Sequence, residues 1–576
     1  MNSFFLQIRF RAKWLILAII VFSLFSILKQ RDRHFSQQWA KPDIPEYSPF
    51  EVPHFTISIK PEDYQFLFSD KPDSLFTYQK AEVSVNRQPV AIKADFRIRG
   101  THSWNWDPAK PSFRLRQSGK RRILGRSNLN IVLPDDPSML ANMVSDNIAS
   151  EIGIPSPRTM ACTVNLNDDY KGLYHLAEPI NPESMSWQGY KNIILIEGNS
   201  RDSRMWQNHK YWEIQILPGQ NPEHARDRLS EMLKIIQVPV KIEQIEKLIP
   251  MFYEDRMASW SALLTAIASI HSNDFFGNFF ALDQLNNKLF PVLADSTGFG
   301  VLTAVAGESS ESEIKMPPYE MLTPLLNSFF RIPEFQFARN RALFLILQNQ
   351  LHPDKTQKLT DQFMQILIPF FKNDPKATAL MNAPALHFPI KVPVSFSKRI
   401  KDHGRLLKFM SERRKFLLNL LNASLVTIQP VSKSVNINNK EFKFLCLSVS
   451  GHSPVSLDFS GMQEFLFPDL NHDGTPDQPP DSFYSVQNLH PALEEAATSN
   501  LPWLQLEQRA AGFILVPASQ TYLLAARNDK FDEVIAFIQN SAHNAITSEK
   551  VSVRLIETTG SFPDRCDTSL HSWRKF

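Results

Sequence analysis

The sequence has little glycine and little net charge, and each shortage excludes a class of function. Eighteen glycines stand against forty prolines in 576 residues, and no glycine-rich loop of the kind that cradles phosphates or dinucleotides occurs. The formal net charge of +3 is too small for the concentrated basic surface that nucleic-acid binding needs. The sequence therefore predicts no nucleic-acid partner and no Walker-type or dinucleotide-binding loop.

Cysteine is also scarce. Cys162, Cys446 and Cys566 are far apart, and no pair has the Cys-x-x-Cys spacing. Three thiols leave at least one unpaired under any disulfide scheme. Because free cysteine packs as a small apolar side chain, we expect these residues to be buried.

The N-terminus carries a targeting signal. Residues 14–28 contain no charge, and Arg9, Arg11 and Lys13 precede them, which is typical of a signal sequence or signal anchor. The run is shorter than the roughly 20 residues of a spanning helix, but no small-residue cleavage site follows it. We interpret residues 1–30 as an uncleaved transmembrane signal anchor with the body exported to the periplasmic or extracellular side. The alternative is a buried core helix.

The period of the apolar residues divides the rest of the chain. Residues 31–52 are polar and contain proline, as in a linker. From residue 53 to about 133, short alternating runs predict half-buried strands, whereas after about residue 222 the apolar residues recur at helical spacing. Helices are expected at 223–236, 241–253, 256–270, 318–330, 335–350, 356–372 and 400–421.

A further helix and a hairpin are expected between these two regions. Residues 138–152 have helical spacing, with Ser138 placed to cap the start and Gly153 to end the helix. Strands are expected at 159–166 and 172–180, with a turn at 167–169.

From about residue 430 the strand-like alternation returns and predicts a separate β-sandwich-like module at 430–576. The fold class is therefore α+β. A strand-rich lobe precedes a helical lobe within residues 53–422, which is the gross order of a protein kinase, and the β-rich module follows.

Basic residues gather on two of the expected strands. Arg99 ends one strand, and Lys110, Arg114 and Arg116 open and follow the next. Arginine offers a planar fork of donors and lysine a point charge, and together they suit a triphosphate.

Alternation along this second strand would place Phe113 and Leu115 in the core, with Arg114 and Arg116 on the opposite face. The alternative to a phosphate site is a solvated basic strand face.

A second group of polar residues lies beyond residue 270. Asp274 is followed by Asn278, and Asp295 comes after an expected hairpin. Phosphoryl transfer needs a carboxylate near the attacking hydroxyl and oxygen ligands for Mg²⁺. An aspartate, an asparagine and a second aspartate supply that set.

Four stretches together resemble the CotH kinase family, an atypical protein-kinase-like family first described among spore-coat proteins. They are the Arg-Gly and Lys-Pro-Ser motifs within 96–116, the Asp-Pro-Ser-x-Leu-x-Asn succession within 129–157, the Gly-x-Tyr hairpin within 164–178, and the loop and strand end within 271–300. The resemblance extends over roughly residues 53–420.

The resemblance implies a two-lobe kinase-like fold with ATP and Mg²⁺ as cofactors. It implies Asp274 as the catalytic base, Asn278 and Asp295 as magnesium ligands, and Arg99, Lys110, Arg114, Arg116 and Glu178 as nucleotide-site residues. Glu178 would orient the phosphate-binding lysine, as an acidic partner does in kinases. The alternative for Glu178 is an ordinary exposed carboxylate at a strand end.

Two departures from the family pattern keep a catalytically silent pseudokinase as an alternative. Asp274 and Asn278 are four residues apart, where typical kinases have a spacing of five. Ala294 and Thr297 stand where many family members have a tryptophan and a second acidic residue. A single acid at Asp295 would bind Mg²⁺ more weakly than a pair would.

The C-terminal module contains a possible calcium loop. Oxygen-bearing side chains occur at alternate positions, and Gly474 stands sixth, where a sharp turn is needed. Position 12 is Pro480 instead of the glutamate of an EF-hand, so a plain polar turn is the alternative. The five expected ligands are Asp469, Asn471, Asp473, Thr475 and Asp477.

The function expected is that of an exported, membrane-anchored kinase that transfers the ATP γ-phosphate to Ser or Thr of surface or envelope proteins. Two alternatives stay open. One is an inactive kinase-like protein that organises an envelope or coat assembly, and the other is a surface protein that binds a polymer or glycan with calcium.

Overall fold

The structure is a computed structural model, and several segments of the chain lie outside the part that it describes. Among these are the expected anchor at 1–30, the expected calcium loop at 469–477, and both Asp274 and Asp295. The described residues are 50–69, 77–86, 91–100, 103–117, 122–134, 136–198, 203–237, 246–269, 277–294, 296, 298–301, 311–316, 323–330, 332–374, 378–383, 388–437, 440–451, 455–457, 465–468, 503–505, 513–515, 520–527, 531–544 and 552–555.

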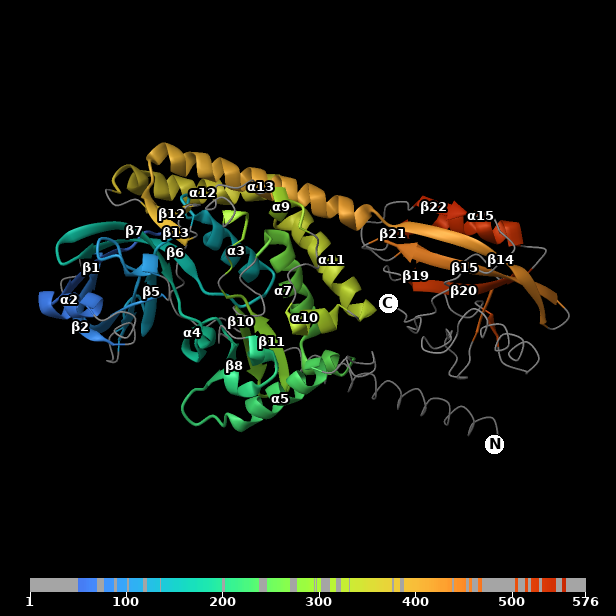
Figure 1. The fold of residues 1–576 in the computed structure, drawn as a ribbon, viewed down its shortest axis with the longest axis horizontal. Helices are drawn as coiled ribbons and strands as arrows, with labels where there is room; N and C mark the ends of the chain where they lie inside the picture. Colours follow the sequence, from blue (N-terminus) through green and yellow to red (C-terminus); the bar gives the residue numbers. More distant parts are fainter. Residues whose placement is uncertain are drawn as a thin grey trace, which may run out of the picture.

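The strand-rich region forms a closed barrel in the order β1-β2-β3-β4-β5-β7-β6 (Figure 1). Alternate residues, such as Phe55 and Ile57 of β1, are fully buried inside it, because one side of each strand faces the barrel core. A short helix, α2 (Pro61–Ser69), follows the first strand. The strands are β1 (His54–Ile59), β2 (Gln79–Val85), β3 (Ile92–Ile98), β4 (Phe113–Arg116), β5 (Asn128–Val132), β6 (Thr159–Leu166) and β7 (Asp169–Ala177).

The turn between β6 and β7 lies where the sequence predicts it. Asn167 and Asp168 both have positive φ, 49° and 63°, the conformation of a two-residue hairpin turn that favours Asn and Asp. The Asn167 side chain also accepts a hydrogen bond from the Ile59 backbone at 2.8 Å. The turn therefore fixes the end of β1, which pairs with β6 in parallel and closes the barrel.

Helix α3 (Leu140–Glu151) crosses between β5 and β6, and its cap differs from the one predicted. Asp136, not Ser138, supplies the main capping oxygen, because its Oδ2 accepts from the Leu140 backbone at 3.0 Å and from Ser138 Oγ at 2.5 Å. The predicted end is confirmed, since Gly153 has φ 77° directly after the last turn.

A four-stranded sheet of order β11-β10-β8-β9 lies beside the helical part. Its strands are β8 (Ile193–Gly198), β9 (Glu213–Gln215), β10 (Asn278–Asp283) and β11 (Lys288–Val292). The predicted hairpin before residue 295 is the β10–β11 pair.

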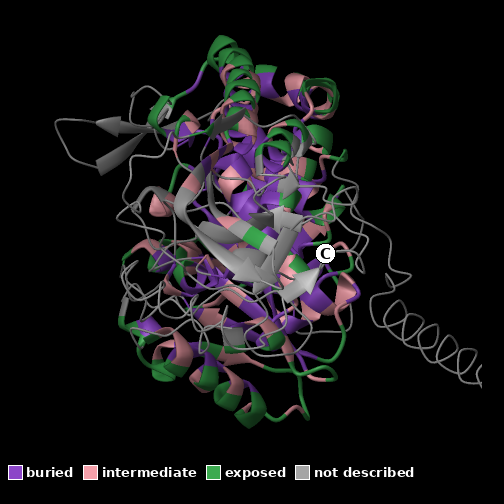
Figure 2. Cartoon of the chain, turned by 90° about the vertical axis from the view of Figure 1, so that its right-hand side faces the viewer, coloured by how far each residue is buried: buried purple, intermediate pink, exposed green. Residues whose placement is uncertain are grey.

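The helical region agrees with the sequence pattern at most of the expected positions. Within the helix expected at 241–253, the described residues form a 3₁₀ helix, η5 (Glu246–Met251), with Pro250 inside it. Buried residues concentrate in the interior between these helices (Figure 2). The helices are α4 (Pro182–Trp187), α5 (Glu223–Gln237), α7 (Glu254–Ile267), α9 (Glu311–Ile314), α10 (Pro324–Phe329), α11 (Pro333–Asn349), α12 (Pro353–Lys372) and α13 (Phe396–Asn422).

A hairpin that the sequence did not predict, β12 (Thr378–Ala383) with β13 (Phe388–Pro393), separates α12 from α13. Strand β13 contacts η2 (Ser103–Trp106), which lies between β3 and β4. The helical region therefore returns to the barrel.

The C-terminal region contains two sheets, of order β18-β17-β20-β15-β14-β22 and β19-β16-β21, together with α15 (Phe531–Ser541). Helix α13 leads directly into β14 (Figure 1). The remaining strands are β14 (Leu425–Ile437), β15 (Lys440–Ser450), β16 (Val455–Leu457), β17 (Phe465–Pro468), β18 (Trp503–Gln505), β19 (Phe513–Leu515), β20 (Gln520–Arg527), β21 (His543–Asn544) and β22 (Ser552–Leu555).

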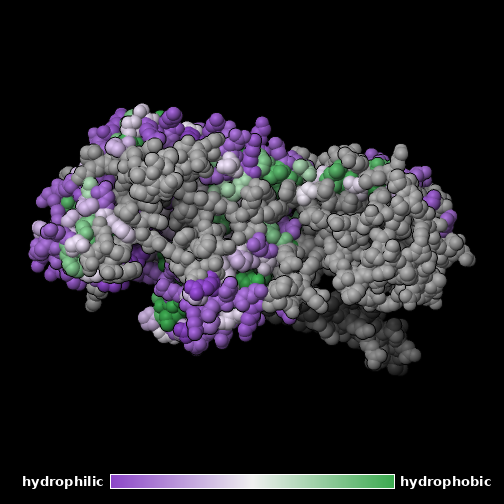
Figure 3. All heavy atoms as spheres, viewed as in Figure 1, coloured by the Kyte–Doolittle hydropathy of each residue, from purple (hydrophilic) through white to green (hydrophobic). Residues whose placement is uncertain are grey.

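The described surface in the view of Figure 3 is largely hydrophilic, with apolar residues in small groups. Within the described ranges, no helix combines the length and the apolar character that a membrane span requires. Cys162 is a free, fully buried thiol on β6, as predicted, and burial raises its pKa.

Candidate active site

The outer face of β3 and β4 carries the basic residues that the sequence singled out. Phe113 and Leu115 are fully buried inside the barrel, so the predicted alternation is confirmed, and Arg114 points outward. The strand register sets Arg114 between Arg97 of β3 and Asn130 of β5. A row of two guanidiniums and one amide therefore crosses the outside of the barrel.

Arg114 is a half-buried cation with a like charge beside it. Its Nε donates to Asn130 Oδ1 at 2.7 Å, and among the described residues no carboxylate lies within ion-pair distance of its guanidinium. Burial lowers the pKa of Arg114, and the neighbouring charge of Arg97 lowers it further. The Tyr78 phenol and the Glu197 carboxylate oppose this shift. The local field at Arg114 therefore favours an anion.

Arg116, two residues along the strand, is in a different environment. Its Nη2 donates to Asp95 Oδ2 at 3.0 Å, and Lys80 binds the other oxygen of the same carboxylate at 2.5 Å. Burial raises the pKa of Asp95, but the hydrogen bonds from Lys80 and Arg116 outweigh this effect and hold the pKa below its usual value. The Arg116 guanidinium also lies 4.0 Å from the centroid of the Tyr78 ring. Arg116 therefore already has a carboxylate partner, which it shares with Lys80.

The Arg99-Gly100 turn is fixed by its neighbours. The Arg99 backbone donates to the Ser112 carbonyl at 2.9 Å, and the Trp106 indole donates to the Gly100 carbonyl at 2.7 Å. Gly100 has φ 97°, and a Cβ on it would come within 2.5 Å of the Asn105 side chain. Glycine is needed here both for the backbone conformation and for space.

Lys110 lies away from solvent, with 2% of its surface exposed. Its Nζ is 3.5 Å from Asp374 Oδ2, and Arg399 donates to the same oxygen at 2.9 Å. Asp374 follows α12, and Arg399 belongs to the first turns of α13, so this ion triad joins the barrel to the helical region. The close approach requires Gly172 of β7, where a Cβ would lie 1.8 Å from Asp374 Oδ1.

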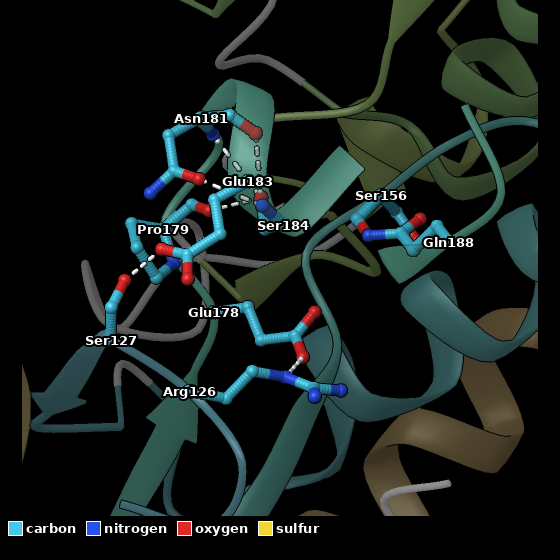
Figure 4. A network of polar contacts seen from close by, with 9 residues as sticks. All are labelled: Arg126, Ser127, Ser156, Glu178, Pro179, Asn181, Glu183, Ser184 and Gln188. Carbon is cyan, nitrogen blue, oxygen red and sulfur yellow. Dashed lines mark hydrogen bonds and ion pairs between the residues drawn. The ribbon is translucent and has the colours of Figure 1, made fainter. Parts of the chain in front are cut away.

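Glu178 binds Arg126, with 2.5 Å between Oε1 and Nε (Figure 4). The predicted pairing of Glu178 with Lys110 is therefore wrong, because the lysine faces Asp374. The alternative of an exposed carboxylate is also wrong, since 2% of Glu178 is exposed. Burial raises the pKa of Glu178 and the Arg126 charge opposes the rise. Arg126 in turn lies 4.2 Å from the Trp187 ring.

The neighbouring contacts in Figure 4 fix the chain that follows Glu178. Asn181 and Ser184 cap α4 through reciprocal hydrogen bonds, and Ser127 hydrogen-bonds Glu183. The Arg126–Glu178 pair therefore belongs to a hydrogen-bonded junction between the barrel and α4.

Asn278 is fully buried as the first residue of β10 and pairs in register with Gly198 of β8. Gly277 before it has φ 70°, so the chain turns sharply into the strand. The structure does not describe the predicted partners Asp274 and Asp295. Whether these three residues converge on one site therefore stays a prediction.

Helix α3 contacts the segment that follows β11. Ser296 Oγ shares a 2.6 Å hydrogen bond with Ser145 Oγ and donates to Asp146 Oδ1 at 3.3 Å. One turn earlier, the Asn142 Oδ1 atom is buried and has no hydrogen-bond partner among the described residues. Sequence reasoning missed this polar stripe. The available signal was a set of polar residues at spacings of three and four in an apolar helix.

The oxygen donors at the start of β10 and on α3 suit a hard cation. Buried amide and carboxylate oxygens occur at Asn278, Asn142 and Asp146, and Mg²⁺ prefers such ligands. Within the described part of the chain, no three His, Cys, Asp or Glu residues cluster as a metal site. A magnesium site formed by the described residues alone would therefore combine few carboxylates with amides, water and substrate phosphates.

Comparisons with known proteins identify a family and a solved structure to which this chain is similar. The family model described as "CotH kinase protein" matches residues 96–417, more than half of the chain. No curated protein matches. Among solved structures, the Helicobacter pylori proinflammatory kinase CtkA matches at 10% sequence identity over 54% of this chain and 93% of that chain, with a TM-score of 0.25. On the family match, the chain belongs to the CotH kinase protein family.

Proposed function

We propose that the protein is a CotH-family phosphotransferase that moves the γ-phosphate of ATP to Ser or Thr of surface or envelope proteins. Family membership supports a kinase-like activity in general. We assign the ATP-binding site from the surroundings of Arg114. This side chain lies half-buried beside Arg97, and no described carboxylate is within ion-pair distance of it.

A phosphate would relieve the unfavourable charge at Arg114. Placing a cation in a poorly solvated position costs free energy unless an anion or a set of acceptors compensates it. An arginine fork matches phosphate oxygens with two parallel hydrogen bonds. Arg116 differs from Arg114, because it is more exposed and already binds the Asp95 carboxylate. We therefore assign the main phosphate contact to Arg114.

Lys110 would play a different part from the one expected of a phosphate-binding lysine. Its ammonium could reach a nucleotide only by leaving Asp374, and the triad with Arg399 opposes that movement. In the proposed function Lys110 holds the barrel in position against the helical region.

The other residues of the proposed site act on the cation and the acceptor. Asn278 and Asp295 would hold Mg²⁺, which neutralises phosphate charge when bound. Asp274 would orient the acceptor hydroxyl and accept its proton. Neither aspartate lies within the described residues, so both roles rest on the family resemblance.

Replacing Arg114 with Met tests the nucleotide assignment. Hydrogen bonds to charged groups contribute about 1.5–3 kcal/mol, so the Kd for Mg²⁺-ATP should rise at least about tenfold, measured by calorimetric titration. Arg226→Met on α5 removes the same charge from an exposed helix and should leave the Kd unchanged. If Arg114→Met binds Mg²⁺-ATP as tightly as the unaltered protein, the phosphate does not lie at Arg114.

A catalytically silent scaffold is the second candidate. It is favoured by Thr297, which stands where many family members have a second acidic residue. Radiolabelled ATP separates the two functions. Binding without transfer to any acceptor would identify the silent protein, whereas autophosphorylation would exclude it.

We further propose that residues 1–30 anchor the protein in a membrane with the body exported, and that the C-terminal sheets form a β-sandwich-like module with a calcium loop. The apolar run at 14–28 and the oxygen-rich loop at 469–477 support these assignments.

A further inference from the structure

We propose that helix α3 supplies ligands to the magnesium site, through the Asp146 carboxylate and the Asn142 amide oxygen. The inference rests on the proposed function, because the cation is the one that phosphoryl transfer requires. It assigns a second carboxylate to a site for which the sequence predicts only Asp295.

The position of Asp146 follows from its contact with Ser296. Their side chains meet at 3.3 Å, and Ser145 binds the same serine at 2.6 Å. Ser296 is the next residue after Asp295 in the chain. The carboxylate of Asp146, which is 8% exposed, therefore lies beside Ser296, the residue that follows the expected metal aspartate in the chain.

Asn142 lies on the same face of α3. Ser145 and Asp146 both contact residue 296, and position 142 precedes their mean position by about one helical turn. Its Oδ1 is buried without a hydrogen-bond partner among the described residues. Such an oxygen is costly unless something binds it, and a cation would supply the missing interaction.

The donor set has the chemistry that Mg²⁺ needs. This ion is usually held by one or two carboxylates together with substrate phosphates and water. Thr297 leaves Asp295 without the acidic neighbour that many family members have two residues later. Asp146 would restore the second negative charge from α3, and Asn142 would add a neutral oxygen.

A purely structural role for Asp146 predicts a different outcome from metal binding. As a hydrogen-bond acceptor for Ser296, Asp146 could be replaced by Asn, because an amide oxygen also accepts. As a metal ligand Asp146 could not be replaced without loss, because an Asn oxygen lacks the charge and binds the cation more weakly. The variant Asp146→Asn separates these two roles without changing the size of the side chain.

The test is Mn²⁺ binding to the full chain in mild detergent, followed by electron paramagnetic resonance without nucleotide. Asp146→Asn should weaken binding at least about tenfold, since loss of even an outer partner of a metal costs that much. Glu151→Gln, on the same helix but paired with Lys355 at the surface, is the matched control and should bind as the unaltered protein does. Melting in chelator checks that each variant is folded.

Asn142→Asp provides the complementary test, because it adds a charge where the amide oxygen lies. The Mn²⁺ affinity should increase several-fold. Weaker or unchanged binding by this variant would remove Asn142 from the site.

Three results would overturn the role of Asp146. They are equal binding by Asp146→Asn and the unaltered protein, no Mn²⁺ binding by the unaltered protein, and an equal loss in Glu151→Gln. Failure of the proposed function has a different signature. If the unaltered protein binds Mn²⁺ through Asp146 but neither binds ATP nor transfers phosphate, the metal site stands and the proposed kinase function is refuted.

Discussion

Asp374 is a buried carboxylate held by cations from distant parts of the chain. Its side chain has no exposed surface, and those of Lys110 and Arg399 are each 3% exposed. Such a triad adds little net stability compared with apolar packing, but removing one charge leaves the others uncompensated. Its members therefore tolerate single substitutions poorly.

Asp374→Asn should lower the free energy of unfolding by about 3–5 kcal/mol, the usual cost of breaking a buried ion pair. Urea unfolding measures it. Gly172→Ala should act in the same direction, because the new Cβ would lie 1.8 Å from Asp374 Oδ1 and φ is +82°. Lys315→Ala, which breaks an exposed pair with Glu311, is the control and should leave the midpoint unchanged. A similarly small effect of Asp374→Asn would mean that the triad is not needed for stability.

At the scale of the element, the start of α3 contains a carboxylate in an unusual state. Asp136 is buried beneath the first turn, and burial together with the nearby Asp402 raises its pKa. His175 and Arg405 oppose this rise through their charges. The cap thus brings charged groups of β7 and α13 close to the Asp136 carboxyl at the start of α3.

Replacing Asp136 with Asn should change how stability depends on pH. A carboxyl whose pKa is raised by folding stabilises most below its unfolded value, near 3.8, and loses this contribution as the pH rises through its folded value. Asn cannot ionise, so the variant should gain stability relative to the unaltered protein between pH 4 and 8. Urea unfolding across this range measures the difference. If the stability of the variant and of the unaltered protein changes with pH in parallel, Asp136 stays charged in the folded protein. Asp354→Asn, at an exposed position on α12, is the control and should leave the pH dependence unchanged.

The elements differ in how far the sequence predicts them. Strands β1 and β6 and the 167–168 turn follow from alternation and turn chemistry, because one strand face meets a core. Hairpin β12–β13 was not predicted, because Pro389 and Pro393 lie within β13 and proline is uncommon inside strands. The described residues Glu246–Met251 form a 3₁₀ helix where an α-helix was expected, because Pro250 lacks a backbone donor.

The site divides in the same way. Alternation correctly placed Arg114 outside the barrel, since that depends only on neighbouring residues. The partners of Lys110 and Glu178 could not be predicted, because Asp374 is 264 residues from Lys110 and Arg126 is 52 residues from Glu178. Periodicity contains no information about such pairings.

At the scale of the whole molecule, the two main cores lie beyond the expected anchor. One is the barrel interior and the other lies between the helices, and both are built from residues after position 51. A chain that keeps its cores can lose a terminal segment without unfolding.

Deleting residues 1–30 should therefore give a protein that is soluble without detergent and unfolds cooperatively. Circular dichroism melting of the soluble fraction measures this. Aggregation of the deleted protein with no folded fraction would show that the segment belongs to the fold.

Calcium should raise the melting temperature of the protein relative to chelator if the 469–477 loop binds it, and Asp473→Ala should abolish the difference.

The Lys110–Asp374 contact also determines when the barrel can be completed during synthesis. The chain emerges N-terminus first, and the seven strands have all appeared by Ala177. The counterion of Lys110 appears about two hundred residues later, and Arg399 after that. A nascent barrel would thus hold the Lys110 ammonium without the Asp374 carboxylate until the helical region has been made. Contacts of such long range slow folding, so the barrel cannot mature as an independent early unit.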